Sequence, residues 1–176
     1  EIACNHGALK YKKRKTGTIE KGKSKDINCA RGVLDIGEPM AVPIINKLLD
    51  NLLEGLNIID CPPGTSCNAV NALKYANGAI LVTEPTKFGL HDLDMAVEVV
   101  KMFNIDYGII INKDDGKENI IRKYCKENNI KIIGAIPYSK DIAEIYSKGE
   151  ILYDDLNQKY IFDELAERIK KVIAWS

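Results

Sequence analysis

An acidic turn contains the residue types best suited to chemistry in this sequence. Asp60 follows the apolar run 56–59 and precedes Cys-Pro-Pro-Gly-Thr-Ser-Cys at residues 61–67. A carboxylate after a buried strand can hold a water bound to Mg²⁺, and the N–H of a glycine can closely approach the γ-phosphate of a nucleotide. The turn therefore predicts half of a Mg-nucleotide site. Asp60 and Gly64 are its candidate catalytic residues, and Pro63 and Thr65 are further candidate cofactor-binding residues.

The usual partner of such a carboxylate is a G-x-x-x-x-G-K-[ST] loop, which would hold the phosphates. Residues 17–24 match this pattern by their letters, but they belong to a basic segment that we interpret as a hairpin or connector, so we expect no phosphate loop in this sequence. From spacing alone, a second interpretation is equally good. Asp60 or Thr65 could simply cap the helix that follows the turn.

Four apolar runs predict the strands that would position this turn, at residues 57–61, 78–83, 107–112 and 131–136. Runs that are apolar at successive positions are typical of strands buried on both faces of a parallel sheet. Apolar residues at helical spacing lie between and after these runs, for example at Leu90, Leu93, Val97 and Val100. We therefore predict an α/β fold with a doubly wound, mostly parallel sheet and helices on both faces.

The first thirty residues have a different composition from the rest. Residues 10–25 contain eight Lys or Arg and a single acid, Glu20, with Gly17 and Gly22 as turn points. This predicts an exposed basic hairpin or connector over 1–30 and an α/β domain over 31–176. A docking surface for an acidic partner is an alternative, but a nucleic acid partner is not expected because Tyr11 is the single aromatic available for stacking.

Overall composition favours a cytoplasmic globular protein. The chain is 45% hydrophobic, and its 25 Lys and Arg equal its 25 Asp and Glu. No apolar stretch approaches the roughly 18 residues that a membrane span requires. Five scattered cysteines suit reduced thiols better than a disulfide framework.

The segment 60–67 resembles the D-x-P-x-G switch II segment of the MinD/ParA/Mrp class of P-loop ATPases. Further pieces are similar, in the expected order, to the branch of this class that carries an inserted ferredoxin domain, namely residues 36–39, 82–93, 111–113, 134–137 and 145–149. The resemblance covers residues 4 to about 173 and favours the nucleotide interpretation of Asp60. It implies a P-loop NTPase-like fold whose first strand and P-loop are not included in this sequence.

The resemblance also implies roles for single residues. Asn112 would bind the edge of adenine, although an Asn there could instead close the strand as an Asx turn. Pro137 and Tyr138 would flank the same base, and Asp60 would hold Mg²⁺ through a water. Cys4 is similar to a ligand of a ferredoxin-type iron–sulfur cluster, which one cysteine cannot hold, so a cluster is expected only in the full-length protein.

By the same resemblance, the whole protein would bind Mg-ATP and hydrolyse it slowly. It would form a homodimer across the nucleotide and act with an iron–sulfur or redox client protein. Because the phosphate loop is absent from this sequence, we expect no measurable ATP turnover from this chain alone.

Two other functions are open. Residues 112–115 match the N-K-x-D motif with which GTPases select guanine, but a GTPase switch reads D-x-x-G, and here the glycine is one residue later, at Gly64. The chain could also be a non-catalytic α/β module that docks a partner protein. This third function follows from the missing phosphate loop, since most contacts to a triphosphate would be absent.

Overall fold

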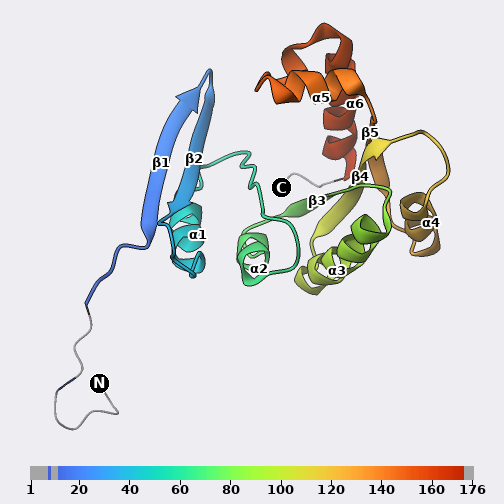
Figure 1. The fold of residues 1–176 in the computed structure, drawn as a ribbon. Coiled ribbons are helices and arrows are strands. Elements are labelled where there is room, and N and C mark those ends of the chain that lie inside the picture. Colours follow the sequence, from blue (N-terminus) through green and yellow to red (C-terminus); the bar gives the residue numbers. More distant parts are fainter. Residues whose placement is uncertain (1–7, 9–11, 173–176) are drawn as a thin grey trace. The chain divides into compact units, whose positions relative to one another are not determined.

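The computed structural model describes residue 8 and residues 12–172 of the chain, which divides into two compact units, Glu1–Asp60 and Cys61–Ser176 (Figure 1). Cys4 lies outside the described residues, so its role as a cluster ligand stays a prediction.

The first unit contains an antiparallel hairpin of β1 (Gly17–Ser24) and β2 (Ile27–Leu34), followed by α1 (Val42–Leu49). Two glycines let the helix approach the hairpin. A Cβ atom on Gly32 would lie 2.5 Å from Ile44 Cγ2, and one on Gly17 would lie 3.1 Å from Ile44 Cδ1. Most hairpin residues are exposed, and Leu49 is the buried residue of α1.

The strand predicted over residues 57–61 is not formed. Residues 56–62 have no regular secondary structure, and the side chains of Leu56 and Ile58 are 66% and 88% exposed. An apolar run becomes a strand only when a neighbouring strand pairs with its N–H and C=O groups. Among the described residues, this run belongs to neither sheet, so the prediction was wrong for this segment.

The second unit is built on a parallel sheet with the strand order β3-β4-β5 (Figure 1). The strands are β3 (Gly78–Thr83), β4 (Asp106–Asp114) and β5 (Ile132–Pro137). These three strands coincide with three of the four predicted runs. Their helices, in chain order, are α2 (Cys67–Leu73), α3 (Lys87–Phe103), α4 (Ile120–Glu127), α5 (Lys140–Ser147) and α6 (Leu156–Val172), with a 3-10 turn, η1 (Leu152–Asp154), before α6.

Helices cover both faces of this sheet, as predicted. Ile109 and Ile111 of β4 pack with residues of α3 and α4, including Leu93, Val97, Ile121 and Cys125. Ile110, between them in the strand, packs on the other face with Ile161 and Leu165 of α6. Successive residues of a strand point to opposite faces, so a continuous isoleucine run serves two cores at once. This alternation holds β4 rigidly in the middle of the sheet.

None of the helices in the described part of the chain is long and apolar enough to cross a membrane.

Candidate nucleotide site

The carboxyl ends of β4 and β5 form the edge at which parallel α/β sheets bind ligands. Here β4 contains an extra residue, because Ile111 pairs with Ala135 whereas Asp114 pairs with Pro137. Lys113, inside this bulge, has a φ of 53°, which non-glycine residues rarely adopt. Bulges commonly re-aim side chains next to functional sites. The bulge contains the predicted base-binding residue Asn112, whose side chain is half-buried.

A buried carboxylate fixes the loop that follows β4. Asp114 is 6% exposed. Its Oδ1 accepts from Asn119 Nδ2 at 3.0 Å, and its Oδ2 accepts from Arg122 Nη2 at 2.6 Å and from the Gly116 N–H at 3.2 Å. The Asp114 backbone oxygen also accepts from the Tyr138 N–H at 3.0 Å. One residue thus ties the end of β4 to α4 and to the loop after β5.

Asn119 links this carboxylate to the start of α4. Its side-chain oxygen accepts from the backbone N–H groups of Ile121 and Arg122, each at 3.1 Å, which is the geometry of a helix N-cap. Its amide nitrogen is then available to donate to Asp114. The helix cap and the charge network therefore share one residue.

An open depression of about 340 Å³ lies beside the bulge, lined by Asp114, Asp115, Gly116, Ala135, Pro137 and Tyr138. Its volume is at the low end of the range for small-ligand sites. Two predicted base-binding residues, Pro137 and Tyr138, are among its lining residues, and the Tyr138 side chain is 69% exposed. The depression offers an aromatic ring and a proline surface, which suit a flat base.

Lys113 and Glu84 join the ends of β3 and β4. Lys113 Nζ lies 2.7 Å from Glu84 Oε1, and the two side chains are 55% and 40% exposed. A pair this exposed contributes little to stability. Nearby, Thr86 Oγ1 accepts from the Gly89 N–H at 2.9 Å and so caps α3. In this structure both Glu84 and Thr86 have structural partners at the end of β3.

The predicted switch residues belong to different units. Asp60 is exposed at the end of the first unit, and Pro63, Gly64 and Thr65 lie in the second, where Thr65 is half-buried. Gly64 has a φ of +83°, and a Cβ atom placed on it would meet no heavy atom within 4 Å. Glycine is therefore favoured here by backbone conformation, and open space remains beside it. Among the described residues of the second unit, neither Gly64 nor Thr65 forms a hydrogen bond or an ion pair with Asn112.

The simpler cap interpretation of the turn is wrong in this structure. The N-cap residue of α2 is Ser66, and no side-chain hydrogen bond caps this helix. Neither Asp60 nor Thr65 fills that position.

Within the described residues, no group of three or more His, Cys, Asp or Glu side chains could hold a metal ion. A single carboxylate is nevertheless compatible with Mg²⁺, which usually keeps several waters and binds substrate phosphates together with one or two carboxylates. Asp60 fits that donor set, whereas an all-protein magnesium cage does not fit these residues.

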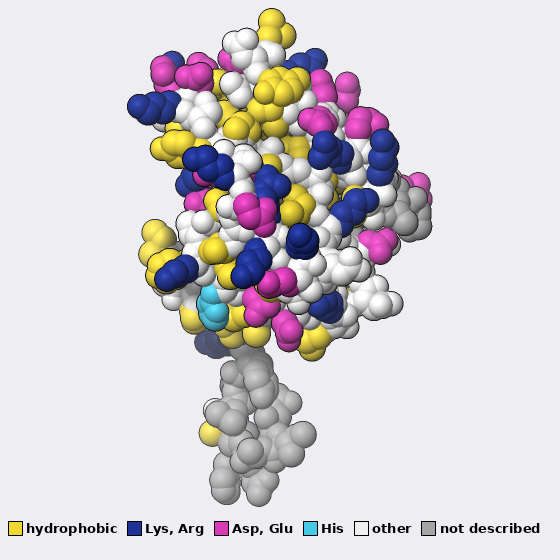
Figure 2. Space-filling view, turned by 90° about the vertical axis from the view of Figure 1, so that its right-hand side faces the viewer, with side chains coloured by type: hydrophobic (Ala, Val, Ile, Leu, Met, Phe, Trp, Pro, Cys, Tyr) yellow, Lys and Arg dark blue, Asp and Glu magenta, His cyan; other side chains and the backbone are white. Residues whose placement is uncertain are grey.

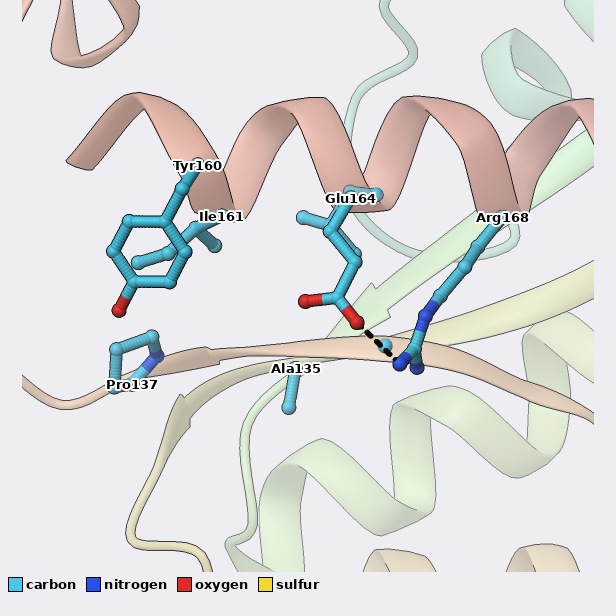
Figure 3. Close-up of a pocket in the computed structure, with 8 residues that line it drawn as sticks. Ala135, Pro137, Tyr160, Ile161, Glu164 and Arg168 are labelled. Atoms are coloured by element: carbon cyan, nitrogen blue, oxygen red, sulfur yellow. Dashed lines mark hydrogen bonds and ion pairs between the residues drawn. The ribbon is translucent and has the colours of Figure 1, made fainter. Parts of the chain in front are cut away.

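A smaller cavity of about 160 Å³ lies between β5 and α6 (Figure 3). Arg168 Nη2 donates to Glu164 Oε1 at 2.5 Å, and Arg168 Nη1 donates to the Ile133 oxygen at 3.2 Å. Tyr160 and Pro137 lie near one another at one end of the cavity. Because its two charged side chains pair with each other, Arg168 is not available to bind a phosphate. We therefore interpret this cavity as part of the packing between β5 and α6.

Sequence reasoning did not identify Asp114, Asn119 and Arg122 as one network. A signal was present for Asn119, since an Asn directly before the apolar pair Ile120 and Ile121 is typical of a helix N-cap. The burial of Asp114 had no such local signal.

A parallel sheet with helices on both faces and a candidate ligand site at the carboxyl ends of its strands is the arrangement of the doubly wound α/β proteins. The ParA family model, described as NUBPL iron-transfer P-loop NTPase, matches residues 36–173. The chain belongs to this family. The predicted membership of the MinD/ParA/Mrp-like superfamily is thereby confirmed.

Relatives agree with this assignment. An uncharacterized protein of Methanocaldococcus jannaschii is 34% identical over 179 residues, which cover 98% of this chain and 61% of that protein. An iron-sulfur cluster carrier protein of Pyrococcus horikoshii is 28% identical, covering 74% of this chain and 51% of that protein. A putative septum site-determining protein MinD of Chlorella vulgaris is 25% identical, covering 70% of this chain and 48% of that protein. The chain thus spans about half to three fifths of the length of these relatives.

Proposed function

We propose that this chain supplies switch II and the base-binding loops of a MinD/Mrp-like ATPase that couples Mg-ATP binding to iron–sulfur chemistry. The observation that carries the proposal is the bulge at Asn112, which adjoins the depression lined by Pro137 and Tyr138 in a chain of the ParA family. The phosphate loop would belong to the whole protein, because residues 17–24, whose letters match G-x-x-x-x-G-K-[ST], form strand β1 of the hairpin and not a loop between a strand and a helix.

Asn112 would bind the adenine edge. A carboxamide offers one acceptor and two donors, and the Asn112 side chain makes no hydrogen bond within the part of the chain that the structure describes. Its half-buried position strengthens a hydrogen bond to a base by excluding some water. Tyr138 and Pro137 would cover the faces of the base, and the bond from the Tyr138 N–H to Asp114 would keep both loops in register.

The turn after Asp60 would respond to the phosphates. Bound Mg²⁺ would neutralise the charge that develops on the transferred phosphoryl group, and Asp60 would hold one of the waters on the ion. The N–H of Gly64 would donate to the γ-phosphate. Its positive φ and the open space beside it support this role, and Pro62 and Pro63 would make the turn move as one piece.

The client chemistry is proposed from the family. Its model is described as an iron-transfer NTPase, and a relative is called an iron-sulfur cluster carrier protein. We propose that the full-length protein carries a ferredoxin insert that ends near residue 30, with Cys4 as one cluster ligand, and that the nucleotide-binding domain covers 31–176. We further propose a cytoplasmic homodimer across the nucleotide. Nucleic acid is not expected as a partner, and the interspersed basic and acidic side chains on the face in Figure 2 agree with this.

GTP is the alternative nucleotide. Asp115, the last residue of the N-K-x-D match, also lines the depression, where its carboxylate could accept from guanine. Its Oδ1 already accepts from the Lys117 N–H at 3.0 Å, which favours a role in the turn. The non-catalytic docking module is the other alternative, and the absence of binding of either nucleotide would support it.

Phosphate release from Mg-ATP tests the proposed function. The chain and the complete product of its gene are assayed separately, each as the wild type and as Asp60→Ala. We expect no turnover from the chain, and turnover from the complete product that falls to background in Asp60→Ala. Asp26→Ala, at an exposed aspartate of the hairpin turn, should retain turnover.

Two results would contradict the proposal. Turnover by the purified chain that Asp60→Ala abolishes would show that the phosphate loop is not needed. The proposed ATP hydrolysis would also be contradicted if the complete gene product contained no G-K-G-G-x-G-K-[ST] loop and released no phosphate from Mg-ATP.

A further inference from the structure

The loop after Asp60 carries an exposed cysteine at each end. Cys61 and Cys67 are both exposed, both lie in the second unit, and five residues separate them. The other described cysteines provide contrasts. Cys29 is exposed in the hairpin of the first unit, whereas Cys125 is 1% exposed in the core.

The backbone between the two thiols is suited to closing a small ring. It bends over residues 63–66, and Gly64 has a φ of +83°, which turns the chain sharply. A Cβ atom placed on Gly64 would meet no heavy atom within 4 Å, so open space lies beside the middle of the loop. The entropy needed to bring two ends together grows with the length of the loop, and is small for so short a segment.

The two ends of the loop lie in different backbone. Cys67 is the first residue of α2, whose Ala69 and Ala72 are buried. Cys61 lies in irregular chain before the turn. A disulfide needs a Cα–Cα distance of roughly 4.4–6.8 Å, and the five residues between the two cysteines are enough for a turn that brings their Cα atoms this close.

We propose that Cys61 and Cys67 are a redox-active pair whose disulfide closes the loop 62–66. In the forming reaction, the thiolate of one cysteine attacks a low-molecular-weight disulfide such as oxidised glutathione, which releases one glutathione thiolate and leaves a mixed disulfide. The thiolate of the second cysteine then attacks the protein sulfur and releases the second glutathione. Two protein thiols are oxidised, one disulfide is reduced, and the two protons go to solvent or to the released thiolates.

A disulfide at this place would act on the switch. The ring contains Gly64, which would move toward the γ-phosphate in the proposed function. This effect on the switch rests on the proposed function, whereas formation of the disulfide does not. The closed loop would be less able to move between nucleotide states. Oxidation would therefore lower the response to Mg-ATP, and a reductant would restore it.

Mass spectrometry of the full chain tests the pair in the absence of nucleotide. A Cys4→Ser background is incubated with oxidised glutathione, remaining thiols are alkylated, and peptides are mapped. We expect the peptide that contains both Cys61 and Cys67 to have lost two hydrogen atoms, because the two thiols are linked and neither is alkylated. Cys29 should carry glutathione as an exposed unpaired thiol. Cys125 should stay unmodified until the protein unfolds, because burial raises the pKa of its thiol.

Single variants give the matched comparison. In Cys67→Ser, Cys61 should retain glutathione as a stable mixed disulfide. In Cys61→Ser, Cys67 should retain it in the same way. Circular dichroism identifies any variant that fails to fold. Wild-type chain in which Cys61 and Cys67 each carry glutathione, with no link between them, would overturn the proposal. A link that forms in a protein that binds no Mg-ATP would instead contradict the proposed function and leave the pair intact.

Discussion

Arg122 Nη2 lies 2.6 Å from Asp114 Oδ2, and the two side chains are 29% and 5% exposed. This pair joins α4 to the end of β4 directly behind the depression. A charged hydrogen bond in so buried a place is strong, and the loss of one partner leaves the other charge uncompensated. The pair therefore fixes the end of β4, the strand that contains the candidate base-binding residue Asn112.

Asp114→Ala should lower the free energy of unfolding by about 3 kcal/mol, because Arg122 would stay partly buried without its partner. Urea denaturation at neutral pH measures this change. Asp115→Ala is the matched control, since Asp115 is exposed and accepts a single backbone hydrogen bond, from Lys117. Its effect should be at most about 1 kcal/mol. Equal losses in the two variants would contradict the role given to Asp114.

Gly89→Ala tests the contact between α3 and the end of β3. A Cβ atom there would lie 2.3 Å from the Glu84 oxygen and 2.9 Å from Thr83 Oγ1. Because the first of these is a backbone atom, the helix or the strand end must shift, at a cost of about 1–3 kcal/mol in unfolding free energy.

Gly22→Ala is the control for this contact, since a Cβ atom on Gly22 would meet nothing within 4 Å. Thermal denaturation of both variants should show a clear loss for Gly89→Ala and little change for Gly22→Ala. An unchanged melting temperature in Gly89→Ala would show that the contact is looser than described.

Alkaline stability should depend on Tyr124. Burial first, and then the hydrogen bond donated to Asp94 Oδ1 at 2.7 Å, raise the pKa of the Tyr124 hydroxyl above its ordinary value of 10.0. The unfolded chain ionises at the ordinary value, whereas the folded chain keeps the proton. This contribution to stability is full below about pH 10 and is lost as the pH rises further.

Tyr124→Phe should consequently lose less stability than the wild type between about pH 9 and about pH 11, as measured by urea denaturation. Tyr146→Phe, at a tyrosine that is 77% exposed, should follow the wild-type profile. Identical pH profiles for Tyr124→Phe and the wild type would contradict the assigned shift.

Much of the second unit could be predicted from its sequence, because its information is local. The runs 78–83, 107–112 and 131–136 became strands since each is apolar at successive positions and each gained a partner. The run 57–61 has the same local pattern but no pairing in the described chain. Pairing is a non-local property, so the apolar pattern could not distinguish this run from the other three.

For the candidate site, the family resemblance indicated Pro137 and Tyr138. Both line one depression at the carboxyl ends of the strands, and their role beside a base stays a prediction. The bulge at Lys113 and the burial of Asp114 depend on register and on a contact with Arg122, in the first turn of the next helix. Neither leaves a signature in the spacing of residues 112–115, which suggested a guanine motif instead.

The binding of Mg-ATP beside Asn112 is the central claim, and two-dimensional NMR of the ¹⁵N-labelled chain tests it most directly. Mg-ATP and Mg-GTP are titrated separately into the wild type and Asn112→Ala, since chemical shifts report even weak binding. We predict that Mg-ATP shifts the backbone amide signals of Asn112, Asp115 and Tyr138 more than Mg-GTP does, and that Asn112→Ala removes the difference. Larger shifts with Mg-GTP, or no shifts at these three residues with either nucleotide, would contradict the account.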